Sequence, residues 1–157
     1  MQPIQVLVVE DSENDAELLM HKLRKEQFDP QWHRVDTELD FLGKLHPELD
    51  LIISDYTMPH FNGLRALDLM KSRGLEIPFI IVSGTMGEER AVRAIKEGAT
   101  DYLMKDRTER LGSAVRQALE KTRLRDTNKK AQQALQEGER KFRTLFDAAH
   151  DAIYDRS

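Results

Sequence analysis

The chain has 157 residues, of which 39% are hydrophobic and 33% charged, and its net charge is −4. This length suits one domain of ordinary size with an appendage, and the composition is that of a water-soluble protein. The absence of cysteine excludes disulfides, thiolate catalysis and cysteine-based metal sites, and it favours a reducing cytoplasm. We expect no signal peptide, and no apolar run approaches the roughly 18 residues of a membrane span.

Short apolar runs alternate with amphipathic stretches through the first part of the chain. The runs predict strands over residues 4–9, 31–35, 49–54, 78–82 and 101–104. Between them, helical spacing predicts a helix capped by Ser12, helices over residues 38–45, 63–73 and 88–97, and a long helix from Glu109 onward. This alternation predicts an α/β fold, with a doubly wound parallel sheet covered by helices on both faces.

The charges are unevenly distributed along the chain. Residues 1–107 contain 13 Lys+Arg and 20 Asp+Glu, whereas residues 108–157 contain 11 and 8. The first part is therefore acidic and the second mildly basic. This change predicts a boundary near Thr108 between a folded domain and an extension.

Polar side chains follow four of the predicted strands. They are the pair Glu10-Asp11, then Asp55, Ser83 and Lys105. The carboxyl ends of parallel strands share one edge of a sheet, and ligands bind at that edge in folds of this kind. We therefore expect three carboxylates, a hydroxyl and an ammonium group to gather there.

The chemistry of such a group is specific. Three carboxylates close together repel one another unless a cation compensates them, and Mg²⁺ suits the task because it takes a few carboxylates and keeps several waters. A carboxylate beside Mg²⁺ can attack phosphorus and form an aspartyl phosphate. The lysine can neutralise one phosphoryl oxygen, and the serine hydroxyl can donate to another. The residues alone predict a Mg²⁺-dependent phosphoryl site.

Each of these residues by itself has a plainer interpretation. An acidic pair such as Glu10-Asp11 is more often part of a solvated loop, Ser83 could cap a helix, and Lys105 could lie on the surface. Their combination at four strand ends favours the site. The five histidines are scattered along the chain, and we interpret them as structural or exposed.

Residues 4 to about 122 resemble the receiver domains of two-component response regulators. The likeness rests on Val-Leu-Val-Val-Glu-Asp ending at Asp11, on Asp55-Tyr-Thr-Met-Pro followed by Gly63, on Ser83-Gly-Thr, and on Gly-Ala-Thr-Asp-Tyr-Leu-Met-Lys at 98–105. It implies a flavodoxin-like sheet of order 2-1-3-4-5. It also implies that Asp55 is the phosphoacceptor and that Ser83 and Lys105 hold the phosphoryl oxygens.

The resemblance further implies a metal site and a switch. Tyr102 is implied as the switch residue, which turns inward when Ser83 moves towards the phosphoryl group. The family usually has Lys-Pro with a cis peptide after its last strand. Asp106 follows Lys105 here, and a non-proline cis bond costs about 2.5–4 kcal/mol, so we expect a trans peptide. The implied Mg²⁺ ligands are Glu10, Asp11, Asp55 and the backbone carbonyl of Thr57.

The chain continues beyond the receiver-like part, to which we assign residues 1–122. Residues 123–138 are predicted to form a helical linker. Residues 139–157 resemble the opening of a PAS sensory domain, a leading helix followed by the first strand. This resemblance implies a longer parent protein, such as a histidine kinase or a cyclic-dinucleotide enzyme.

An interrupted apolar stripe runs along this extension. It predicts a weak homodimer through the C-terminal helix. The basic residues between 116 and 130 also fit a nucleic-acid arm, but no aromatic residues interleave with them, so a solvated helix is favoured. The stripe repeats at steps of four and three residues: Leu124, Asn128, Ala131, Leu135, Gly138, Phe142 and Leu145.

These patterns predict a signalling module that takes a phosphoryl group on Asp55 from a histidine kinase or phosphotransfer protein and switches a downstream output. A degenerate receiver that binds partners without phosphorylation is the alternative, and the complete residue set argues against it. An aspartate-nucleophile phosphatase would need a second aspartate where Thr57 stands. A flavodoxin-like cofactor site would need a phosphate-cradling loop where Glu10-Asp11 would repel phosphate.

Overall fold

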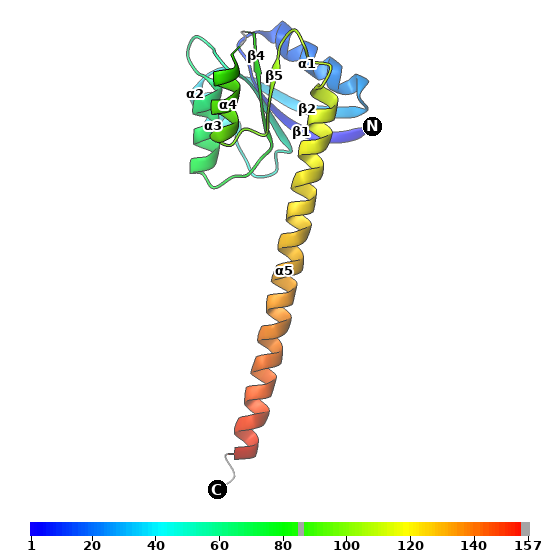
Figure 1. The fold of residues 1–157 in the computed structure, drawn as a ribbon, viewed down its shortest axis with the longest axis vertical. Coiled ribbons are helices and arrows are strands. Elements are labelled where there is room, and N and C mark those ends of the chain that lie inside the picture. The colour runs from blue at the N-terminus through cyan, green and yellow to red at the C-terminus, as the bar shows by residue number, and fades with distance from the viewer. Residues whose placement is uncertain (85–86, 155–157) are drawn as a thin grey trace. The chain divides into compact units, whose positions relative to one another are not determined.

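The computed structural model describes residues 1–84 and 87–154, with side chains as far as Phe146. Within these residues, five parallel strands form one sheet in the order β2-β1-β3-β4-β5 (Figure 1). This order confirms the predicted doubly wound, flavodoxin-like fold. The strands are β1 (Gln2–Val9), β2 (Phe28–Val35), β3 (Leu51–Asp55), β4 (Phe79–Ser83) and β5 (Asp101–Met104).

Helices cover both faces of the sheet, as Figure 1 shows. One apolar cluster joins a sheet face to α2, α3 and α4, and the other joins the opposite face to α1 and the first turns of α5. In β1, Leu7 and Val9 belong to the first cluster, whereas Val6 and Val8 belong to the second. Successive side chains of a strand point to opposite faces, so a strand buried on both sides is apolar throughout. The helices are α1 (Glu13–Lys25), α2 (Glu38–Lys44), α3 (Gly63–Ser72), α4 (Glu88–Lys96) and α5 (Leu111–Tyr154).

Local capping explains where several helices begin and end. The Ser12 hydroxyl accepts a hydrogen bond from the backbone N–H of Asp15, which confirms the predicted cap of α1. Gly74 and Gly98 follow α3 and α4 with φ of 71° and 115°, a region that glycine enters without strain. These turns reverse the chain so that each helix packs back onto the sheet.

The second strand is longer than its sequence pattern predicts. It begins at Phe28, whereas the apolar pattern predicts a start at residue 31. Pro30 lies inside it, opposite Ile4 of β1. The proline is tolerated because β2 is an edge strand, where one side of the backbone needs no partner. The other strands end within one residue of their predicted ends.

The chain divides into two units, Met1–Glu120 and Lys121–Ser157. In the first, Leu111, Val115 and Leu119 of α5 pack in the second apolar cluster. The second is helical through Tyr154, so the strand implied by the PAS resemblance does not begin by that residue; residues 155–157 lie outside the described part. No helix in the described ranges combines the length and apolarity that crossing a membrane requires.

Candidate functional site

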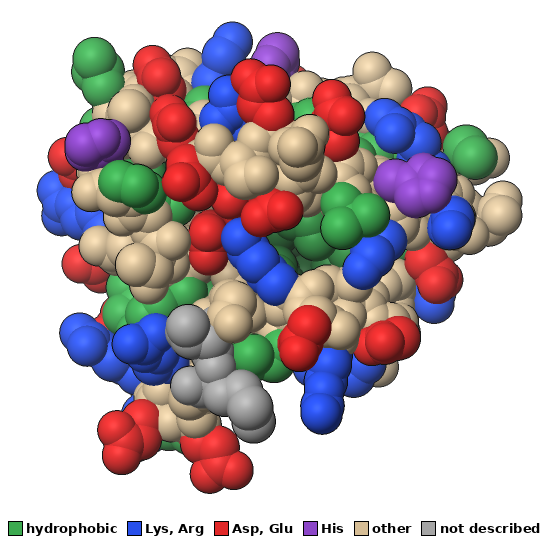
Figure 2. Space-filling view, turned by 90° about the horizontal axis from the view of Figure 1, so that it is seen from above, with side chains coloured by type: hydrophobic (Ala, Val, Ile, Leu, Met, Phe, Trp, Pro, Cys, Tyr) green, Lys and Arg blue, Asp and Glu red, His purple; other side chains and the backbone are tan. Residues whose placement is uncertain are grey.

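Asp55 is the last residue of a fully buried central strand. It pairs in register with Val82 of β4, and its side chain is 10% exposed. The neighbouring strand β1 ends at Val9, directly before Glu10 and Asp11. The register of the parallel strands therefore brings these carboxylates to one edge of the sheet, as the sequence predicts. The face seen from above in Figure 2 carries many Asp and Glu side chains, with Lys and Arg among them.

Gly63 permits the loop after Asp55 to fold back closely. The N–H of Gly63 donates to the carbonyl oxygen of Tyr56 at 3.0 Å. A Cβ at Gly63 would lie 2.8 Å from the backbone oxygen of Asp55 and 3.3 Å from the Ser54 hydroxyl. Any larger residue would therefore displace the backbone of the candidate phosphoacceptor. The glycine of the sequence motif has a steric reason in this structure.

Three carboxylates form a group that fits a divalent cation. One oxygen atom from each of Glu10, Asp11 and Asp55 lies within 4.8 Å of the others. Glu10 and Asp55 are buried, whereas Asp11 is exposed, so the group opens to solvent on one side. An all-oxygen set with an open side suits Mg²⁺, which keeps several of its waters. Thr57, the fourth implied ligand, lies in the loop after β3, bridged to Asn62.

Lys105 joins this group from the end of β5. Its ammonium nitrogen lies 3.0 Å from Glu10 Oε2, 3.2 Å from Asp55 Oδ2 and 3.0 Å from Asp15 Oδ2. Burial lowers the pKa of Lys105, but hydrogen bonds to Glu10 and Asp15 and the charge of Asp55 outweigh it and raise that pKa overall. Lys105 is therefore a permanent cation at the site. The described residues contain no cis peptide, as expected for Lys105–Asp106.

Glu10 has an unusual electrostatic environment. Its side chain is 2% exposed, and burial raises its pKa to about 7, although the hydrogen bond from Lys105 and the Ser12 N–H oppose the shift. Nearby Asp55 adds to the shift by charge repulsion. A cation bound between these carboxylates would relieve both causes, because it stabilises their charged forms.

The predicted hydroxyl and switch residues also lie near this edge. Ser83 is 2% exposed and pairs with Met104 of β5, and its carbonyl accepts from the Lys105 N–H at 2.8 Å. Tyr102 packs on the first apolar cluster, and its buried phenolic oxygen has no hydrogen-bond partner among the described atoms. Thr85 of the Ser83-Gly-Thr motif lies outside the described residues.

An aromatic contact connects Tyr102 with the loop after Asp55. The rings of Tyr56 and Tyr102 meet edge to face, with centroids 6.2 Å apart, and the Arg90 guanidinium lies 5.3 Å from the Tyr56 centroid. Tyr56 directly follows Asp55, and Arg90 belongs to α4. A chain of contacts thus runs from the site to α4.

Sequence reasoning missed one neighbour of the site. Asp15 is not among the predicted site residues, yet its carboxylate contacts Lys105. The two residues are 90 positions apart, and no periodicity connects them. The only hint in the sequence is that Asp15 falls in the first turn of the helix that directly follows the Glu10-Asp11 loop.

Comparisons with known proteins agree with this geometry. Residues 6–116 match the family described as "Response regulator receiver domain". The two-component response regulator ORR5 of Oryza sativa subsp. japonica is 38% identical over 105 residues, which make up 64% of this chain and 76% of that protein.

Solved structures give the same result. The receiver domain of a putative Luxo repressor protein from Vibrio parahaemolyticus has a TM-score of 0.70 and 29% identity, over 81% of this chain and 97% of that one. The receiver domain of a signal transduction histidine kinase from Syntrophus aciditrophicus has a TM-score of 0.61 and 31% identity, over 74% and 90%. The fold and the acidic edge define a receiver-type signalling domain. The chain belongs to the response regulator receiver domain family.

Proposed function

We propose that this domain accepts a phosphoryl group on Asp55 from a histidine kinase or a phosphotransfer protein and thereby switches an output. Asp55 and Lys105 carry the proposal: a buried strand-end carboxylate lies 3.2 Å from a permanent cation and within 4.8 Å of two further carboxylates. A degenerate receiver that only binds partners would not need this cluster of carboxylates, whose mutual repulsion costs stability. A reducing cytoplasm is the proposed setting.

The proposed reaction is a phosphoryl transfer. A carboxylate oxygen of Asp55 attacks phosphorus, the P–N bond of the donor phosphohistidine breaks, and its electron pair remains on the imidazole nitrogen. Mg²⁺, held by Glu10, Asp11, Asp55 and the Thr57 carbonyl, would neutralise charge on the phosphoryl oxygens. Lys105 would donate to another phosphoryl oxygen.

After transfer, the switch would use the two remaining residues. Ser83 would move towards the phosphoryl group and donate its hydroxyl to it, and the orientation of Tyr102 would follow that movement. The contacts of Tyr56 with Tyr102 and Arg90 support a route from this event to α4. In a Lys105→Ala variant, phosphorylation should therefore no longer change the surroundings of Tyr102, which NMR shifts would report.

Acetyl phosphate provides a direct test of the proposed chemistry. With Mg²⁺, the protein should gain one phosphoryl group, seen as one mass increment in the intact protein. Asp55→Asn and addition of EDTA should each remove the increment. Asp50→Asn is a matched control, because Asp50 is an acidic residue at the opposite end of β3 that accepts the Gln5 N–H at 2.7 Å. Equal labelling of the Asp55→Asn variant would show that another residue is the acceptor.

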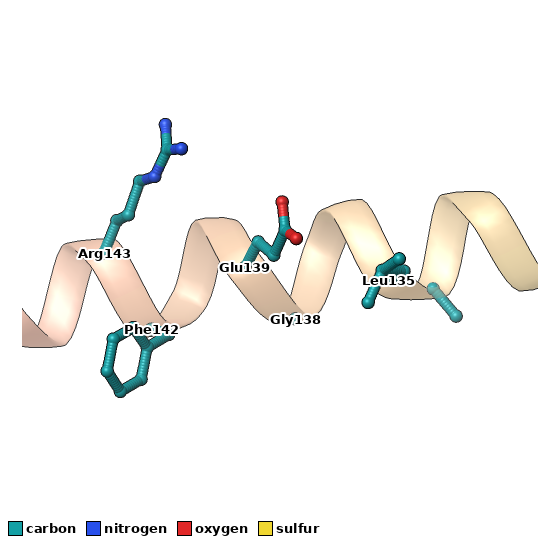
Figure 3. A pocket seen from close by; sticks show the side chains of 6 residues that line it. Leu135, Gly138, Glu139, Phe142 and Arg143 are labelled. Carbon is teal, nitrogen blue, oxygen red and sulfur yellow. The ribbon is translucent and has the colours of Figure 1, made fainter.

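We also propose that α5 passes the signal on by pairing with a second copy of itself in a longer, PAS-containing parent protein. In Lys121–Ser157, Leu135, Gly138 and Phe142 lie along one side of the helix, whereas Glu139 and Arg143 point away from it (Figure 3). Leu135 is 64% and Phe142 70% exposed. Burying this stripe against a twin would stabilise a helix that is otherwise marginal in water.

The composition of the apolar stripe, which would form the seam between two paired helices, predicts weak, parallel pairing. Asn128 lies within the stripe, which favours a parallel register at a cost in stability, and Gly138 contributes no side chain to it. Sedimentation should show a concentration-dependent dimer that Leu135→Lys abolishes. Gln132→Lys, which adds the same charge beside the seam, is the control. A monomer at every concentration, with and without a phosphoryl mimic, would contradict the pairing.

A further inference from the structure

Lys105 is bound by three carboxylates from three different elements. Glu10 follows β1, Asp55 ends β3, and Asp15 lies in the first turn of α1. All three lie 3.0–3.2 Å from the ammonium nitrogen. A lysine ammonium has three N–H donors, so these contacts use its full capacity. Lys105 can donate to a new oxygen only if one of the three present partners gives up its place.

The three partners differ in how easily they can be released. The side chains of Glu10 and Asp55 are 2% and 10% exposed, whereas that of Asp15 is 46% exposed. A buried carboxylate that loses its partner remains desolvated, but an exposed one is hydrated again by water. A cavity of about 40 Å³, lined in part by Asp15 and Lys105, adjoins the pair and has room for a water molecule. Asp15 is the partner that Lys105 can leave at the smallest cost.

Asp15 is also outside the candidate metal group. That group consists of Glu10, Asp11 and Asp55. A cation bound there would occupy oxygen atoms of Glu10 and Asp55. Asp15 is not part of that group, so a bound cation leaves its contact with Lys105 in place.

We propose that Asp15 is a positioning residue that holds Lys105 in the resting domain and is exchanged for a phosphoryl oxygen when Asp55 is modified. This inference rests on the proposed phosphoacceptor function, and it adds that Asp15 competes with a phosphoryl oxygen for Lys105. The Asp15–Lys105 contact stabilises the unmodified state and has to be given up in the modified one. Asp15 therefore sets how strongly the domain retains a phosphoryl group or its mimic.

The test measures binding of beryllofluoride, a phosphoryl mimic, to the whole chain in the presence of Mg²⁺ by calorimetry. Asp15→Asn removes the charge, and the cap of α1 persists because Ser12 bonds the backbone N–H of residue 15. Affinity should rise about two- to five-fold, the range of a partly exposed ion pair. In the metal-free protein, the same variant should speed exchange of the Lys105 ammonium protons with water, as seen by NMR.

Three further variants isolate the contact. Asp15→Glu keeps the charge and should restore the affinity of the parent. Glu13→Gln removes one charge from the same helical turn, but Glu13 pairs with Arg34 at 3.3 Å, so affinity should change less than 1.5-fold. In a Lys105→Ala background, Asp15→Asn should lose most of its effect, because the effect acts through Lys105.

The outcomes distinguish a failure of the proposed function from a failure of the role of Asp15. A parent chain that binds no beryllofluoride contradicts the proposed function itself. A parent that binds it, together with an Asp15→Asn variant of equal or lower affinity, overturns only the role of Asp15. A full-sized effect of Asp15→Asn in the Lys105→Ala background also overturns that role, because it would come from general electrostatics.

Discussion

The two units of the chain differ in whether their large apolar side chains are buried. In Met1–Glu120, Phe41 and Phe79 are fully buried between sheet and helices. In Lys121–Ser157, Phe142 and Leu145 are 70% and 71% exposed. The first unit buries its apolar side chains internally, whereas the large apolar side chains of the second unit stay exposed in the described residues. Stability should therefore come from the first unit, and association from the second.

The largest expected difference concerns phenylalanine. Phe79→Ala should lower the free energy of unfolding by about 3–5 kcal/mol, because it leaves a cavity in the first apolar cluster. Phe142→Ala, the same change in the second unit, should stay within about 0.5 kcal/mol. Urea denaturation at low protein concentration measures both. A cost above 2 kcal/mol for Phe142→Ala would show that the second unit is packed against something in the monomer.

The pH dependence of stability should come from the first unit as well. The pKa of Glu10 is raised from 4.5 to about 7 in the folded protein. Between pH 4.5 and about 7, the folded state therefore binds a proton that the unfolded state does not. The contribution of Glu10 to the free energy of unfolding is complete below pH 4.5 and is lost as pH rises through about 7. Without Mg²⁺, stability should fall by up to about 3 kcal/mol from pH 4.5 to 8. Glu10→Gln should remove that fall, and its persistence in the variant would assign the effect to other groups.

Replacing one glycine in each unit by alanine should give smaller effects on stability, of opposite sign. Gly63→Ala should cost about 1–3 kcal/mol, because its Cβ would press on the backbone oxygen of Asp55 at 2.8 Å. Gly138→Ala should stabilise α5 by about 1 kcal/mol, since the added Cβ would meet nothing within 4 Å apart from its chain neighbours and the backbone of its own helix. Thermal unfolding and helical circular dichroism measure the two effects. A stabilised Gly63→Ala variant would contradict the close approach at the site.

Much of the fold was predictable because buried parallel strands have a simple signature. Continuous apolar runs such as residues 4–9 predicted β1, and the polar residue after each run predicted the site edge. Gly74 and Gly98 marked helix ends because both adopt positive φ. Where burial is one-sided, as at the start of β2, the pattern weakened and the boundary was wrong by three residues.

Contacts between distant side chains were not predictable in the same way. The partnership of Asp15 with Lys105 depends on how α1 packs on the sheet, which no local pattern reports. The burial of the Tyr102 phenolic oxygen is one of two arrangements that a half-buried strand tyrosine can adopt. The helix continues to Tyr154, although the PAS resemblance implied that a strand would follow its leading helix, because most of residues 139–154 favour a helix.

The most direct test of the central claim is to locate the phosphoryl group chemically. After reaction with acetyl phosphate and Mg²⁺, borohydride reduces an aspartyl phosphate to homoserine, which peptide mass spectrometry assigns to one position. We expect homoserine at position 55, and none when EDTA replaces Mg²⁺. Homoserine at any other position, or none under conditions that add a phosphoryl group to the intact chain, would contradict Asp55 as the acceptor.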